Sequence, residues 1–166
     1  MIDRFDGEHA FLSNFFEGPL PVVLKGREFR TAEHAYQACK TADPEQQAAI
    51  QAAATPGQAK RLGSTATLRP GWEETKVRVM VAIIQAKFAP TTELSHRLMA
   101  TGSQQLIEGN TWGDTFWGCV LEPGPKDGTW VGRNELGRIL MEQRRLLQHE
   151  IPFGPVDSSA TAGATT

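Results

Sequence analysis

The sequence predicts a helix-rich α+β fold, a compact single domain with a small β-sheet. Two long segments, about residues 72–88 and 134–149, carry apolar residues at helical spacing. Cap residues and prolines mark the starts of several shorter helices. Strand signals are few and short, so helices are expected to dominate.

The first 30 residues are expected to be extended. Within them, residues 21–30 resemble a hairpin that turns at Lys25-Gly26. Thr31 is a good N-cap residue, and it predicts a helix that continues to about Thr41.

Two further helix starts combine a cap residue with a proline at the first helical position. Asp43-Pro44 predicts a helix to about Ala54. Thr55-Pro56 predicts a shorter helix that ends at Gly63.

The strongest helix is expected over residues 72–88, where Pro90 stops it. A helix over residues 92–100 follows and closes at Gly102. The expected buried face of the strongest helix comprises Val77, Met80, Val81, Ile84 and Phe88.

The remaining elements are two short strands over residues 105–108 and 116–121, a Gly/Pro-rich loop over 123–132, and a final helix over 134–149. The side chains of this helix expected to face inward are Leu136, Ile139, Leu140, Leu146 and Leu147.

Composition excludes several classes of protein. The chain has 166 residues and a formal net charge of −2, so it is not a nucleic-acid binder held by bulk charge. No apolar segment approaches the length of a membrane helix, and the N-terminal residues lack a secretory signal pattern. Cys39 and Cys119 are isolated and the histidines are scattered, so no metal site is expected. These features predict a cytoplasmic protein with no membrane partner.

The domain is expected to cover residues 1–150. Residues 151–166 include a run of small side chains with little apolar surface, GPVDSSATAGATT at 154–166. Such a segment cannot offset its ordering entropy by burial, so a disordered tail is expected.

A polar stripe is predicted on the helix that follows Thr31. At about 100° per residue, Glu33, Gln37 and Lys40 fall on one face, with Tyr36 beside it. The stripe could border a catalytic cleft. It could equally be a solvated face with a Glu–Lys pair and a structural His34.

A second cluster, residues 108–118, interleaves Trp112 and Trp117 with carboxylates and glycines. Indoles offer stacking surfaces for a base or a sugar, whereas the alternative is an aromatic loop that caps the core.

A third cluster, residues 132–137, lies at the start of the last helix. Arg133 could bind an anion there, and the simpler interpretation is an N-cap by Asn134.

Taken together, seven fragments resemble the NADAR family with its YbiA-like members, over about residues 9–147. They are FLSNF at 11–15, TAEHAYQACK at 31–40, AKF at 86–88, LMATG at 98–102, LIE at 106–108, DTFWG at 114–118 and GRNELG at 132–137. The resemblance implies an enzyme that hydrolyses N-glycosidic bonds. It implies one of two activities: release of ribose 5-phosphate from early riboflavin-pathway intermediates, or removal of ADP-ribose from guanine bases of DNA or RNA.

The resemblance also implies the site. Lys40, Glu33 and Asp114 are the expected catalytic residues, with Lys40 acting as a nucleophile or as a cation on ribose or phosphate. No metal or other cofactor is expected. The expected substrate-binding residues are Asn14, Phe15, His34, Tyr36, Glu108, Trp112, Trp117, Arg133 and Asn134.

Two other interpretations remain open at this point. The same residues would serve a non-catalytic module that binds ADP-ribose or NAD-like ligands. A purely structural role for the motifs is disfavoured, because charged residues are poor core residues unless they are paired.

Overall fold

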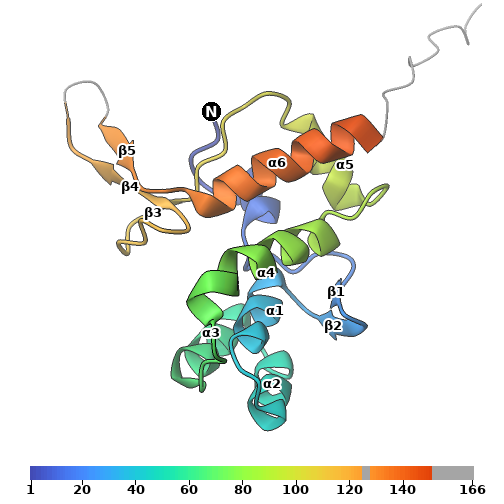
Figure 1. Ribbon diagram of the computed structural model, residues 1–166. Coiled ribbons are helices and arrows are strands. Elements are labelled where there is room, and N and C mark those ends of the chain that lie inside the picture. The colour runs from blue at the N-terminus through green and yellow to red at the C-terminus, as the bar shows by residue number, and fades with distance from the viewer. Residues whose placement is uncertain (125–127, 151–166) are drawn as a thin grey trace, which may run out of the picture.

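The computed structural model describes residues 1–124 and 128–150, with the side chain of Glu150 left aside. It has the expected helix-rich α+β architecture (Figure 1). The helices are the 3₁₀ helix η1 (Gly7–Leu12), α1 (Ala32–Cys39), α2 (Pro44–Gln51), α3 (Pro56–Thr65), α4 (Trp72–Lys87), α5 (Glu93–Ala100) and α6 (Glu135–Glu150). The strands are β1 (Val22–Leu24), β2 (Arg27–Phe29), β3 (Gly109–Asn110), β4 (Cys119–Glu122) and β5 (Thr129–Val131).

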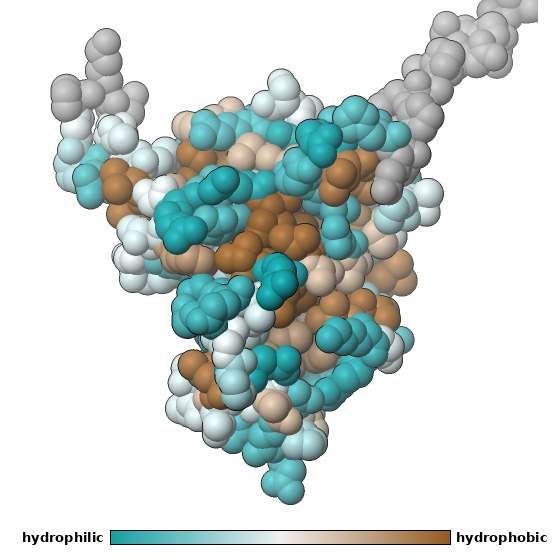
Figure 2. Space-filling model, in the orientation of Figure 1, coloured by the Kyte–Doolittle hydropathy of each residue, from teal (hydrophilic) through white to brown (hydrophobic). Residues whose placement is uncertain are grey.

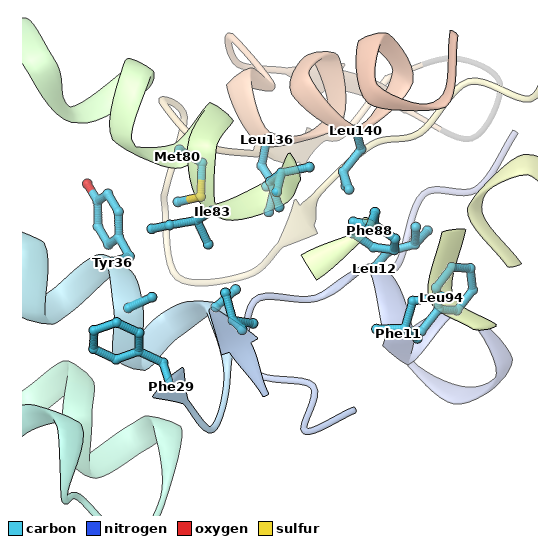
Figure 3. Close-up of a cluster of buried hydrophobic side chains, with 14 of the residues drawn as sticks. Phe11, Leu12, Phe29, Tyr36, Met80, Ile83, Phe88, Leu94, Leu136 and Leu140 are labelled. Carbon is cyan, nitrogen blue, oxygen red and sulfur yellow. The ribbon is translucent and has the colours of Figure 1, made fainter. Parts of the chain in front are cut away.

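The helices stack from one end of the molecule to the other (Figure 1). Helix α4 crosses the middle, α6 lies along one side of it, and α1 to α3 cluster on the other. Helix α1 contacts α2, α3 and α4, whereas α6 contacts α4 and α5. Figure 3 shows the core between these layers, where Met80 and Ile83 of α4 meet Leu136 and Leu140 of α6.

The predicted hairpin and helix starts are confirmed, but the first 30 residues are not all extended, because η1 forms within them. Strands β1 and β2 pair antiparallel, with Val22 opposite Phe29. The hydroxyl of Thr31 accepts a hydrogen bond from the backbone N–H of His34, and the Asp43 carboxylate accepts two in the same way. Each cap satisfies backbone donors that the first helical turn leaves unpaired.

The strand predictions are partly wrong. Residues 105–108 form only an isolated bridge, Leu106 to Ile2, and the expected strand over 116–121 begins at Cys119 instead. The expected loop over 123–132 contains β5, which pairs antiparallel with β4, while β3 pairs with β4 in parallel. These strands are two to four residues long, too short for alternation to reveal them.

The buried face of α4 also differs from the predicted one. Val77 and Val81 are only half-buried, while Ile83 and Lys87 are buried. The difference arises because α4 is covered on two sides, by α1 and β1 on one and by α6 on the other. Between α4 and α6, Figure 2 shows an apolar groove that includes Val81 and Ile139.

Gly63 lies inside α3 and does not end it. A Cβ at this position would lie within van der Waals overlap of the Gln37 side chain, so the glycine permits α3 to approach α1 closely. The reason for this glycine is therefore tertiary packing.

We expect Gly63→Ala to lower both stability and activity, because the added methyl group must displace Gln37. Overpacking of this kind costs about 1–3 kcal/mol. Thermal unfolding measures it, with Ser64→Ala, an exposed position on the same helix, as the control. A Gly63→Ala melting temperature equal to that of the control would contradict the packing argument.

Within the described residues, no helix is long and apolar enough to cross a membrane. The expected disordered tail over residues 151–166 lies outside the described residues, and the division of the chain at residue 150 stays a prediction.

Candidate active site

A cavity of about 630 Å³ lies between α1, α3, α4 and the loop that precedes β4. It collects residues from six separate parts of the chain. Its lining comprises Ser13, Asn14, Phe15, Glu33, Tyr36, Gln37, Lys40, Gly57, Lys60, Met80, Glu108, Trp112, Asp114, Trp117 and Leu136. Two of the three sequence fragments with candidate chemistry, on α1 and in residues 108–118, therefore meet at one place.

The polar stripe of α1 lines this cavity, so of its two interpretations the structure favours the border of a cleft over a solvated face. The Oε1 atom of Glu33 accepts a hydrogen bond of 2.7 Å from Nε2 of Gln37. Burial raises the pKa of Glu33, and the charges of Lys60 and Lys40 partly oppose that change. Burial likewise lowers the pKa of Lys40, although Glu33 opposes it. Burial therefore makes the amine of Lys40 easier to deprotonate than that of a solvated lysine.

Aromatic rings form one wall of the cavity. Tyr36 lies between Trp72 and Trp117, with ring centroids 5.3 and 5.5 Å away. The Nζ atom of Lys40 is 5.4 Å from the centroid of the Tyr36 ring. Burial raises the pKa of Tyr36, which therefore stays a neutral phenol at physiological pH.

The cavity rim is aromatic and cationic. Trp112 is 64% exposed, and Nζ of Lys60 lies 5.7 Å from the ring centroids of both Trp112 and Phe15. Exposed indole and phenyl faces beside a cation can hold the flat part of an anionic ligand.

Glu108 and Lys87 form a second pair of buried ionisable groups. Burial, followed by the negative charges of Asp114 and Glu33, raises the pKa of Glu108 to about 7, while Lys87 and Lys60 oppose the change. Burial lowers the pKa of Lys87 to about 7, and the charge of Glu108 opposes this.

The Nζ atom of Lys87 donates a hydrogen bond of 2.6 Å to the carbonyl oxygen of Ser13. In the last turn of a helix, a lysine commonly just compensates the helix dipole. In the structure this one is buried and holds the segment that carries Asn14.

Asp114 lies in the cavity wall, and one of its oxygens is already engaged. Its Oδ1 atom accepts hydrogen bonds of 2.9 Å from the backbone N–H groups of Phe116 and Trp117. The Asn110 side chain also donates a hydrogen bond to the carbonyl of Asp114 and accepts one from its backbone N–H. Asp114 therefore shapes the turn that presents Trp117, besides adding negative charge near Glu108.

Three buried acceptor atoms of the cavity residues have no hydrogen-bond donor among the described residues: Oδ1 of Asn14, Oε1 of Gln37 and Oε2 of Glu108. Oε1 of Gln37 faces Gly63 of α3. Unpaired buried polar atoms are costly, and a bound ligand is one source of the missing partner for the other two.

Three of the expected site residues are not brought to the cavity. His34 is fully buried, where its ring nitrogens bond to Thr31 Oγ1 at 2.8 Å and to the Ala53 carbonyl at 3.1 Å. The side chain of Arg133 forms an ion pair of 2.8 Å with Glu135.

Asn134 has a structural function that is not a simple N-cap. Its φ angle is 52°, and its side chain accepts from the N–H of Glu108 and donates to the carbonyl of Leu106. It therefore joins the start of α6 to the segment that carries Glu108.

The sequence did not single out Gly57, Met80 or Leu136 as site residues. Met80 and Leu136 were expected in the core, and they form both core and cavity floor. The cavity also contains one residue of a basic group in the sequence. Of Lys60, Arg61, Arg69, Lys76 and Arg78, Lys60 alone lines the cavity.

The fold and the cavity define a small α+β enzyme domain with a lysine and carboxylates beside stacking rings. The NADAR domain family matches residues 3–148. The chain is 34% identical over 145 residues to N-glycosidase YbiA of Escherichia coli strain K12, which covers 86% of this chain and 84% of that protein. The chain belongs to the NADAR family.

Other relatives agree with this assignment. N-glycosidase Npun_R5314 of Nostoc punctiforme is 34% identical, with 85% of this chain and 87% of that protein covered. The riboflavin biosynthesis protein VVA0006 of Vibrio vulnificus is 38% identical, but the chain spans only 39% of its length. The NMR structure of E. coli YbiA matches with a TM-score of 0.73 and 33% identity, over 90% of this chain and 86% of that one.

Proposed function

We propose that the chain is an N-glycosidase that hydrolyses the bond between a phosphorylated ribose and a base-like amine. The observation that carries this proposal is the convergence of Lys40, Glu33 and Glu108 on one cavity in which buried acceptors lack donors. Ribose hydroxyls and amines are donors of the required kind. Relatives that match the chain along most of their length are named N-glycosidases, and nothing supports a non-catalytic module.

The preferred substrate is an early, phosphorylated intermediate of the riboflavin pathway, a ribosylaminopyrimidine. Two relatives that the chain covers only in part are named riboflavin biosynthesis proteins. A cavity of about 630 Å³ suits a ligand of nucleotide size. Lys60, the other lysine in the cavity lining, provides positive charge for the phosphate.

Lys40 acts as the nucleophile in this proposal. When the ribosylamine opens, the C1–O4 bond breaks, O4 takes a proton, and C1 becomes an imine of the base nitrogen. The neutral amine of Lys40 attacks C1, and the base leaves as a free amine, which produces an imine between C1 and Nζ. Water hydrolyses that imine and releases the sugar as an aldehyde that recloses.

Glu108 and Glu33 move protons in these steps. A carboxyl group with a pKa near the working pH is an efficient proton donor and acceptor, and the pKa of Glu108 is raised to about 7. Glu33 lies on the same helical face as Lys40 and can accept a proton from the attacking amine. No metal or other cofactor is needed for these steps. That expectation and the expected cytoplasmic location stay predictions.

In this scheme, the negative charge of Asp114 helps to raise the pKa of Glu108. We expect Asp114→Asn to lower the pKa of Glu108, because removing the negative charge removes one cause of its upward shift. The falling limb of the pH profile of kcat/KM should therefore move to lower pH. The asparagine keeps an acceptor for the turn, and Asp43→Asn, a remote helix cap, is the control. An unmoved limb would exclude this electrostatic role.

Trp117 supplies a stacking surface for the base. We expect Trp117→Ala to raise KM more than it lowers kcat, because base stacking contributes about 1–3 kcal/mol. Trp117 also packs edge-on against Tyr36 and Phe116, so melting temperature must be measured in parallel. A large loss of stability with an unchanged KM would show that the indole serves packing alone.

A second candidate substrate is guanine that carries ADP-ribose, in DNA or RNA. A further cavity of about 650 Å³ adjoins the site and shares Ser13, Glu108 and Trp112 with it. It adds Arg4 and Trp130, a cation and a ring that would suit the second half of an ADP-ribosyl group.

A side-by-side assay tests the proposal. The phosphorylated ribosylaminopyrimidine and ADP-ribosylated guanosine DNA are each incubated with the chain, and release of the free base is measured by chromatography. We expect faster release from the pyrimidine, whereas faster release from the DNA would favour the second candidate. Binding of either compound without release of base would overturn the enzymatic proposal.

A further inference from the structure

We propose that the chain has a second ligand site, on the opposite side of α1, that binds a phosphate ester of nucleotide size. The site is a cavity of about 570 Å³ between the β1–β2 hairpin, the end of α1, the segment before α4 and the first half of α4. Figure 1 shows the hairpin beside α4. None of its lining residues belongs to the candidate active site.

The charge of this cavity is entirely of one sign. Lys25, Arg27, Arg69 and Arg78 line it, and no carboxylate does. Among the described residues, none of the four lies within 4.0 Å of a carboxylate oxygen, whereas several other arginines of the chain form such pairs. Four cations gathered around one hollow repel one another, and an anion would relieve that repulsion.

Two of the arginines are held in place by neutral groups. The guanidinium of Arg27 donates hydrogen bonds of 2.7 Å to the side-chain oxygens of Gln47 and Gln51. The Nη2 atom of Arg69 donates to the carbonyl of Thr41 at 2.8 Å. These contacts fix the side chains without neutralising their charge, which prepares them to bind an anion.

Arg69 also has a buried donor without an acceptor. Its Nε atom is inaccessible to solvent and has no hydrogen-bond partner among the described residues. Among all the described residues, the other buried side-chain atoms without a hydrogen-bond partner are oxygens. Because Nε itself is enclosed, a phosphate would bind at the other nitrogens of this half-buried guanidinium, a group whose geometry matches phosphate well.

The floor of the cavity is apolar, which restricts the ligand further. Besides the cations, the cavity is lined by the apolar side chains of Leu24, Phe29, Ala38, Val79 and Ala82. Inorganic phosphate would leave this floor uncovered, whereas an ester with a flat or apolar part would cover it. The ligand class is therefore a phosphate ester, with the phosphate on the arginines and the organic group on the floor.

Titration of the ¹⁵N-labelled chain with adenosine 5′-monophosphate, followed by two-dimensional NMR at low salt, tests the site. We expect shifts at the backbone amides around Arg27 and Val79, which report on this cavity. The amides of Glu33 and Trp117 report on the active site. Adenosine and inorganic phosphate serve as separate probes and should each bind at least about tenfold more weakly at this cavity.

The variant pair Lys25→Gln and Arg78→Gln should weaken binding at this cavity by about tenfold or more, because it removes two exposed charges of the lining. Arg30→Gln with Arg61→Gln makes the same change of net charge outside the lining and should have little effect.

Equal weakening by both pairs would show bulk charge alone and overturn the proposal. So would shifts confined to the active site, or no shifts up to about 10 mM ligand. Binding of adenosine or of inorganic phosphate as tight as that of the nucleotide would overturn the assignment to a phosphate ester. None of these results bears on Lys40, so the proposed N-glycosidase activity is tested independently.

Discussion

Lys40→Ala is expected to abolish turnover while the chain stays folded. The side chain lies in the cavity wall with Glu33 and Tyr36, and burial lowers the pKa of its amine. Loss of the nucleophile removes a covalent step that no neighbour can replace, and such losses lower kcat by roughly 10⁴–10⁶. Single-turnover release of the base, with circular dichroism to confirm the fold, measures this effect.

Two further variants make that result specific. Lys40→Arg keeps a positive charge but cannot form an imine, so it should be as inactive as Lys40→Ala. Lys60→Ala removes the other cavity-lining cation and should mainly raise KM. A well-folded Lys40→Ala enzyme with substantial activity would remove Lys40 from the catalytic residues, and activity in Lys40→Arg alone would assign it an electrostatic role.

Glu108→Gln is expected to lower kcat by roughly 10²–10⁴, the contribution of a general acid or base. It should also remove the decline of kcat/KM above about pH 7, since the pKa of Glu108 is raised to about 7. The pH profile distinguishes proton transfer from a structural role, because a packing defect would lower the rate without moving the limb.

The stability of the same variant provides the control. In the folded chain the pKa of Glu108 lies above its ordinary value of 4.5, so folding favours the protonated form. Glu108 therefore lowers the stability of the wild-type chain as pH rises from about 4.5 through about 7, and Glu108→Gln lacks this contribution. The melting temperature of Glu108→Gln minus that of wild type should therefore be larger at pH 8 than at pH 5. A relative decrease would show that the carboxylate form is stabilised by folding.

Local signals in the sequence predict much of the fold. Thr31 and Asp43 cap their helices as expected, and helical periodicity places Glu33 and Lys40 on one face of α1. These features depend on neighbours within one turn, which a sequence displays directly. The match of several fragments to one family further predicts that the α1 stripe and residues 108–118 belong to a single site.

Features that depend on tertiary contacts could not be predicted in this way. The burial of Lys87 against Ser13 joins residues 74 positions apart. Asn134 bonds across to Leu106 and Glu108, although its position before a helix indicates a cap. Likewise, Gly63 ends a helix by local rules, whereas it lies inside α3 because α1 packs against it.

The central claim is that Lys40 forms a covalent imine with the sugar, and reductive trapping tests it most directly. The chain is incubated with the phosphorylated ribosylaminopyrimidine and sodium borohydride, digested, and analysed by mass spectrometry. Reduction converts the imine to a stable secondary amine, so a ribose-phosphate adduct should appear on Lys40 and be absent from Lys40→Ala. An adduct on Lys60 or Lys87 instead, or none while the base is being released, would contradict the claim and favour direct attack by water.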